Sequence, residues 1–301
     1  MSRSEDLSVS EPAAVETAYT AVASRRMARR LLSGAGTATV VPYRLAPGMP
    51  PQMVLHALDG AGRVIIAALP ALDHPLATVP EGVPVAVRLD VELEAANAGL
   101  RVTTASCHLL GTLTWLDDDD ARLLAGHSAA CHCPITGESP LVALASLAAA
   151  EGGRIGVVLA DRVTVHDPMG VGGHSIAQVL DPANDRAGAL LWSQASTASA
   201  QEEVCALGEI ALDLLVSGVM RGCTPGVVCS VRPSAGLCAG LRGRVLCVDV
   251  SPYGVTLMRL GVQETETVQL MLPPGTTLPA QVGQHLGVLV SEVMVAGLLE
   301  V

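Results

Sequence analysis

Two neighbouring stretches decide the fold: VPVAVRLDVELEA, at Val83–Ala95, and LRVTTASCHLLGTLTWL, at Leu100–Leu116. Both are rich in β-branched residues, and in both the apolar and polar side chains partly alternate, which is typical of strands with one buried face. Asn97, Ala98 and Gly99 form a turn signal between them. We therefore expect two long strands joined as a hairpin. Strands of this length fit a barrel in which they bend as they go round.

Shorter strand-like segments surround this pair. Three precede it and two follow it, at Thr37–Arg44, Gln52–Leu58, Arg63–Leu69, Arg154–His166 and His174–Leu180. Turn residues at Asp59–Gly62 separate the second segment from the third. Short spacing with hairpin-like turns favours a barrel or a sandwich over a parallel α/β sheet. Helices are expected at Thr17–Leu32 and Leu141–Ala150, where the apolar residues follow a helical spacing.

The second half of the chain predicts a small domain of its own. After a linker at 181–189 we expect a helix, three antiparallel strands and a helix, at Ser199–Met220, Arg244–Val250, Gly254–Leu260, Thr267–Leu272 and Pro279–Val295. Tyr253 and Gly254 should form the tip of the first hairpin, with Gly254 free to take a positive φ. Its core is expected to combine Val245, Val255, Leu257 and Leu270 with Ile210, Leu214 and Leu286. The chain thus divides into a disordered tail (1–15), a barrel domain (16–180) and a C-terminal domain (190–301), and the class is α+β.

Composition excludes several kinds of chemistry. The formal net charge of the 301 residues is −11, so nucleic-acid binding has no electrostatic support. All 18 basic residues are Arg, and without Lys a Schiff-base enzyme or the usual Walker A phosphate loop is excluded. Charged residues or Pro interrupt every apolar stretch before the ~20 residues that span a bilayer, and Met1–Glu16 has no apolar signal core. We expect a cytoplasmic protein with no membrane partner, whose eight Cys are mostly reduced.

The order of these elements resembles the split β-barrel superfamily. It is most similar to an actinobacterial branch with pyridoxamine-phosphate-oxidase-like proteins and heme-utilisation oxygenases, in which a helix–sheet–helix domain follows the barrel. The resemblance is carried by ARRLLSGAGTATVV (Ala28–Val41), HALDGAGRVIIAAL (His56–Leu69), HLLGTLTWL (His108–Leu116), and DVSPYGVTLMR with TVQLMLPP (within Asp249–Pro274).

This resemblance implies a homodimer with ligand sites where the two barrels meet. Members hold FMN, a deazaflavin or heme there, and some hold nothing and act as binding partners. The chain departs from the family at one point: heme-utilisation relatives often carry His-x-x-x-x-His in the first helix of the second domain, whereas Trp192–Leu212 contains no His. Heme binding of that kind therefore lacks its usual ligands here.

The densest group of metal-capable side chains is His127, Cys131, His132 and Cys133, which ends at Pro134. Cys and His are suitable ligands for zinc, an iron–sulfur cluster or heme iron. This group is the predicted metal site. A second group, made of Cys223, Cys229, Cys238 and Cys247, has spacings that match no zinc or iron–sulfur pattern.

A flavin phosphate would need cationic partners, and Arg is the only one available. Arg63, Arg88 and Arg101 are candidates because they lie on or beside expected strands; otherwise they solvate a strand face. His56 and His108 lie inside strands, as cofactor ligands or as hydrogen-bonded core imidazoles.

Two functions remain open at this stage. The first is a cofactor-binding split barrel, with heme or FMN, involved in heme, iron or redox metabolism; an oxidoreductase is expected if there is turnover. The second is a cofactor-free dimer that works as a regulatory or protein-interaction module. No nucleophile–base or paired-carboxylate constellation can be argued from spacing.

Overall fold

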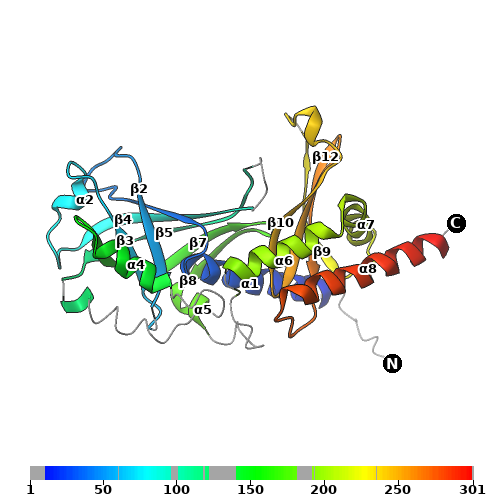
Figure 1. The fold of residues 1–301 in the computed structure, drawn as a ribbon, viewed down its shortest axis with the longest axis horizontal. Coiled ribbons are helices and arrows are strands. Elements are labelled where there is room, and N and C mark those ends of the chain that lie inside the picture. The colour runs from blue at the N-terminus through cyan, green and yellow to red at the C-terminus, as the bar shows by residue number, and fades with distance from the viewer. Residues whose placement is uncertain are drawn as a thin grey trace, which may run out of the picture.

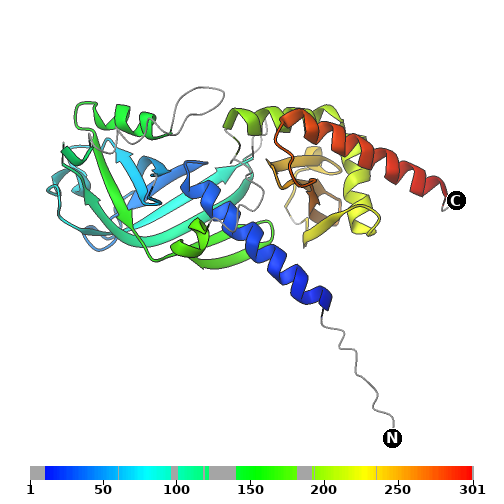
Figure 2. The ribbon, with the colours of Figure 1, turned by 90° about the horizontal axis from the view of Figure 1, so that it is seen from below.

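The structure, a computed structural model, describes residues 11–59, 61–95, 101–117, 119–121, 140–181, 192, 194–234 and 236–299. It contains an eight-stranded sheet in the first half of the chain and a four-stranded sheet in the second. Figures 1 and 2 show the two sheets lying end to end, with helices packed on both. The expected α+β class, with a barrel followed by an antiparallel sheet, is confirmed.

Six strands of the first sheet close a barrel. The strand order is β4-β1-β2-β3-β6-β5, and β4 also pairs with β5, so the ring has no free edge. Every neighbouring pair is antiparallel. The strands are β1 (Thr37–Val41), β2 (Gln52–Leu58), β3 (Val64–Ala68), β4 (Val85–Glu94), β5 (Thr103–Trp115) and β6 (Arg154–Leu159).

The long strand β5 has two different neighbours along one edge. Its C-terminal part, Thr112–Trp115, pairs with β6, whereas Ser106–His108 pairs with β7 (Arg162–Asp167). The segment expected as one strand is therefore two, which turn at Ala160 and Asp161. Strand β8 (Gly170–Ser175) extends the sheet beyond β7. The predicted strand at His174–Leu180 is wrong beyond Ser175. Ile176–Leu180 forms the short helix α5 instead, because Ser175 and Gln178 form a capping box.

Helices fill and cover the barrel. Leu31 and Leu32, at the end of α1 (Glu11–Leu32), are fully buried in the same core as barrel residues such as Leu109. Helix α4 (Pro140–Ala148) packs Leu144 against the outer side of β2, β3 and β6. A four-residue helix, α2 (Pro75–Thr78), follows β3. Helix α1 begins at Glu11 rather than at Thr17, so it includes the end of the expected tail. Helix α1 contacts β4 and β5 on their core side, and their outer side is left without a helix in the described part of the chain.

The second unit is a four-stranded antiparallel sheet in the order β10-β11-β12-β9. The elements are α6 (Gln194–Ala206), α7 (Glu209–Met220), β9 (Gly226–Pro233), the 3-10 turn η3 (Ala239–Leu241), β10 (Val245–Ser251), β11 (Gly254–Leu260), β12 (Glu264–Met271) and α8 (Pro279–Leu299). Strand β9 was not expected. The expected helix at Ser199–Met220 is broken at Gly208, whose φ of +82° favours glycine.

Most of the expected core of this unit is buried. Val245, Val255, Leu257, Leu270 and Leu286 are at most 6% exposed. The expectation for Ile210 is wrong: its side chain is 82% exposed, and Leu212 and Leu215 point inward from α7 in its place.

The hairpin between β10 and β11 turns at Pro252 and Tyr253, with Ser251 paired to Gly254. Gly254 is therefore the first residue of β11, and its φ is not positive. Glycine is required at position 254 for another reason: a Cβ there would lie 2.6 Å from the carbonyl oxygen of Leu270. None of the helices in the described ranges has the length and apolar character needed to cross a bilayer.

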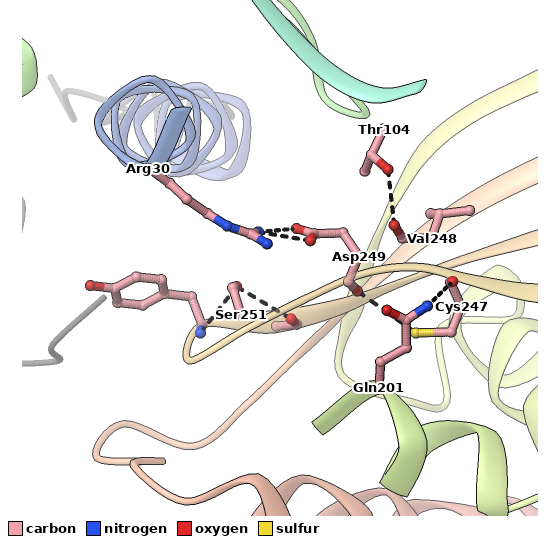
Figure 3. Close-up of polar contacts among 9 residues, drawn as sticks. Arg30, Thr104, Gln201, Cys247, Val248, Asp249 and Ser251 are labelled. Carbon is pink, nitrogen blue, oxygen red and sulfur yellow. Dashed lines mark hydrogen bonds and ion pairs between the residues drawn. The ribbon is translucent and has the colours of Figure 1, made fainter. Parts of the chain in front are cut away.

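Specific contacts join the two units (Figure 3). Arg30 of α1 pairs with Asp249 of β10, with Nη1 lying 2.7 and 2.9 Å from the two carboxylate oxygens. The hydroxyl of Thr104 donates to the carbonyl oxygen of Val248 at 2.9 Å. Apolar residues at the end of the β4–β5 hairpin, such as Ala95, also pack on the second sheet. The N-terminal helix is thus fixed to a strand near the C-terminus.

Candidate functional site

Arg88 and His108, two of the predicted site residues, share a partner on the uncovered outer side of β4 and β5. The antiparallel register places Asp90 of β4 opposite His108 of β5. Nδ1 of His108 lies 2.7 Å from one Asp90 oxygen, and Nε of Arg88 donates to the other at 2.8 Å. A carboxylate at Nδ1 selects the tautomer in which Nδ1 carries the proton. Nε2 of His108 is then left as the lone-pair nitrogen, on a side chain that is 40% exposed.

A second imidazole lies beside the first. His166, exposed on β7, has its ring centroid 5.4 Å from that of His108, with the planes at 81°. Within the described residues no three His, Cys, Asp or Glu side chains are grouped so that they could chelate a metal ion. The outer face of β4 and β5 thus presents two neighbouring imidazoles, those of His108 and His166.

A groove of about 640 Å³ lies on the same two strands, two residues further along. Ligand pockets typically measure ~300–1,000 Å³. Leu110 and Leu159 line the groove and are 64% and 60% exposed. Tyr43 and Arg44 also line it, and the Arg44 guanidinium lies 5.8 Å from the centre of the Tyr43 ring.

Gly111 lines the groove at the point where β5 changes partners. It lies on β5 between the part paired with β6 and the part paired with β7. A Cβ on Gly111 would lie 2.5 Å from the carbonyl oxygen of Leu159, so only glycine permits the close approach of these backbones. The branching of β5 and its glycine together shape the groove.

Two of the predicted arginines lie elsewhere. Arg63 precedes β3 and pairs with Asp59 of the same turn, at 2.6 Å. Arg101 precedes β5, is 89% exposed and lies 3.7 Å from Glu94. Neither lines the groove.

His56 points into the barrel core. It is 5% exposed, and its Nε2 lies 2.6 Å from the carbonyl oxygen of Leu31 at the end of α1. Burial lowers the pKa of His56, and the hydrogen bond to Leu31 opposes this only in part. Of the two readings left open for this residue, the geometry favours the core imidazole.

The predicted metal group, His127, Cys131, His132 and Cys133, lies outside the described residues. The second cysteine group does not form a site, since no metal-chelating cluster occurs among the residues that are described. Cys247 is buried and Cys223 and Cys238 are exposed. Burial raises the pKa of Cys229 to about 12, which keeps that thiol protonated.

Asp90, Tyr43 and Arg44 were missed in the sequence. Alternation along the β4 segment does place Asp90 on the same face as Arg88, so this signal was present. Its contact with His108 depends on the register of two strands, which the spacing alone does not fix.

No protein-family model and no curated protein matches the chain. Solved structures similar to it include a heme-binding protein from Mycobacterium smegmatis, at 13% identity with a TM-score of 0.43, which covers 89% of this chain and 97% of its own. Another is the protein Atu2129 of unknown function from Agrobacterium tumefaciens, at 16% identity with a TM-score of 0.37, covering 89% of this chain and 95% of its own.

Proposed function

We propose that this chain is a heme-binding protein whose site is the outer face of β4 and β5, with His108 as the axial ligand. One observation carries the proposal: Asp90 contacts Nδ1 of His108, a side chain that is 40% exposed and lies two residues before Leu110, which lines a groove of about 640 Å³. A carboxylate partner of this kind orients a ligating imidazole and increases its basicity.

Four of the groove residues could contact a flat group with carboxylates at its edge, although Asp161 also lines the groove. Leu110 and Leu159 offer exposed apolar contact, and the Tyr43 ring adds an aromatic wall. Arg44 is exposed, and among the described residues no carboxylate forms an ion pair with it, so its charge is available to a propionate. Bound heme would supply redox-active iron; the chain's residues would bind it, orient it and shield one of its faces.

FMN is the second cofactor that the resemblance implies. Its phosphate would need a cluster of free cations, but Arg88 is already paired with Asp90. Among the arginines of the described residues, Arg44 is the one that lines the groove. The described residues therefore support heme better than FMN.

Titration with hemin, followed by absorption spectroscopy, tests the proposal. Wild-type protein should give a saturable Soret band, and His108→Ala should weaken binding at least tenfold. Asp90→Asn removes only the partner of the ligand, so it should weaken binding roughly 10–100-fold and less than His108→Ala does. His285→Ala, which replaces a partly exposed imidazole on α8, is the matched control and should bind like wild type. Identical spectra and affinities for wild type and His108→Ala would refute the proposal.

We also propose that the same face pairs with a second copy of the chain. Leu110 and Leu159 are exposed apolar residues on a sheet side that no described helix covers, and such patches commonly mark interfaces. Light scattering should give a dimer at micromolar concentration, and Leu110→Arg should give a monomer. A dimer that binds neither hemin nor FMN would favour the cofactor-free interaction module instead.

A further inference from the structure

The imidazole of His166 lies beside that of His108 and takes no part in the proposed heme site. The antiparallel register of β5 and β7 pairs His108 with Thr164 and Ser106 with His166. The two histidines are therefore diagonal neighbours on adjacent strands, close enough for long side chains to meet. Their ring contact places both on the same outer side of the sheet. This closeness is set by the backbone pairing of two strands.

The separation of the two rings is that of two imidazoles bound to one metal ion. Zinc holds an imidazole nitrogen at ~2.0–2.1 Å, which puts the ring centroid ~3.2 Å from the ion. At the tetrahedral angle that zinc prefers, two such centroids lie ~5.2 Å apart. The centroids of His108 and His166 are 5.4 Å apart. One ion could thus bridge the rings with little movement of either strand.

The nitrogens suit this arrangement. Asp90 contacts Nδ1 of His108 at 2.7 Å, which leaves Nε2 as the lone-pair nitrogen. A carboxylate behind a histidine is the usual outer-shell partner of a metal-ligating imidazole, because it fixes the ring and increases its basicity. His166 is exposed, and the broad χ2 preference of an imidazole lets its ring turn a nitrogen toward the ion.

The chemistry of the ligands limits the kind of ion. Imidazole nitrogens suit zinc, nickel and copper, whereas magnesium and calcium take oxygen ligands. Among the described residues no group of three metal-binding side chains is present, so water would complete the coordination, as in open zinc sites. Arg88 is the nearby cation, and its pairing with Asp90 at 2.8 Å offsets its repulsion of a metal ion. The formal charge of the chain, −11, favours a cation in general.

We infer that His108 and His166 form a site for one divalent transition-metal ion of the zinc class, bound through two imidazole nitrogens and completed by water. The site shares His108 with the proposed heme site, so zinc and heme iron exclude one another at Nε2. The inference does not rest on hemin binding, because zinc alone is sufficient to test it.

Calorimetric titration with Zn²⁺, without hemin, tests the site. The parent protein carries His127→Ala, Cys131→Ser, His132→Ala and Cys133→Ser, so that the metal group predicted from the sequence does not contribute. It should bind one zinc ion at the imidazole pair. Loss of an outer-shell partner alone costs ~10–100-fold in metal affinity. In the parent, His108→Ala and His166→Ala should therefore each weaken binding by at least about tenfold, and Asp90→Asn by about tenfold.

The double variant distinguishes a chelate from two separate ligands. His108→Ala with His166→Ala should bind zinc about as weakly as either single variant, because either substitution already breaks the chelate. The Cε1–H proton signals of both histidines should also move together in NMR spectra, up to one equivalent of Zn²⁺.

His285→Ala, which replaces a partly exposed imidazole on α8, is the matched control and should keep the affinity of the parent. Circular dichroism checks that every variant is folded. An affinity that is unchanged in His166→Ala would overturn the inference, and so would two losses that add in the double variant. Failure of hemin to bind the same proteins would count against the heme proposal and leave the zinc site standing.

Discussion

The ion pair between Arg30 and Asp249 should stabilise the junction of the two units measurably, and a double-mutant cycle isolates its contribution. The side chains of Arg30 and Asp249 are only 16% and 9% exposed, and Nη1 of Arg30 contacts both carboxylate oxygens. Removing one partner of a buried pair costs ~3–5 kcal/mol, much of it from the charge left unpaired. Asp249→Ala leaves Arg30 unpaired, which keeps some access to water, so we expect it to lower the free energy of unfolding by about 2 kcal/mol. Arg30→Ala leaves the more buried Asp249 unpaired, and we expect a loss of about 3 kcal/mol.

The double variant should lose about 3 kcal/mol rather than 5, because the second substitution removes a charge that no longer has a partner. Urea unfolding of the four proteins, followed by circular dichroism, measures the coupling directly. The exposed pair of Arg101 and Glu94, at 3.7 Å, is the matched control, and its cycle should give less than ~0.5 kcal/mol. If the two losses at Arg30 and Asp249 add to within ~0.5 kcal/mol, the ion pair does not stabilise the junction.

Three further predictions concern stability. Burial lowers the pKa of His56 and of His174, in the latter case together with nearby arginines, so below pH 6.5 the unfolded chain binds more protons than the folded one. As the pH is lowered below ~6.5, the free energy of unfolding should therefore decrease by up to ~1.4 kcal/mol per pH unit for each His. Urea titrations at pH 7.5, 6.5 and 5.5 that show no decrease would contradict this. Gly254→Ala should destabilise the second unit by at least ~1–3 kcal/mol, since the new Cβ would lie 2.6 Å from a carbonyl oxygen of β12; a variant that unfolds like wild type would show that this approach is not tight. Gly208→Ala should cost ~1–3 kcal/mol because its φ of +82° and ψ of 160° fall in a region that only glycine readily adopts. Gly240→Ala, which meets no atom and needs no positive φ, is the control and should change the urea midpoint little.

The parts of the fold that the sequence predicted are those with a clear local signal. The apolar residues that alternate along the two long segments are the ones buried in β4 and β5. In β4, for example, Val87, Leu89 and Val91 face the core. The break at Gly208 was missed because apolar spacing continues across it, and nothing in that spacing reports a positive φ. Strand β9 was missed because it is an edge strand whose residues are mostly half-exposed, so it lacks alternation.

The candidate site was only partly predictable, for a different reason. Arg88 and His108 could be chosen by residue type, but their common partner Asp90 required the cross-strand register. His56 and His108 look alike in sequence, as single imidazoles inside strands. They differ because one faces the carbonyl oxygen of Leu31 in the core and the other faces the outer side of the barrel.

The attachment of α1 to β10 has a consequence for the order in which the protein assembles on the ribosome. Arg30 and Asp249 are 219 residues apart in the chain. At ~5–20 residues per second, about 11–44 s pass between synthesis of the first and of the second. During this interval α1 can pack its apolar residues into the barrel, but its guanidinium must remain hydrated. The junction therefore cannot close before β10 is made, and a chain released before that point presents α1 with no partner for Arg30.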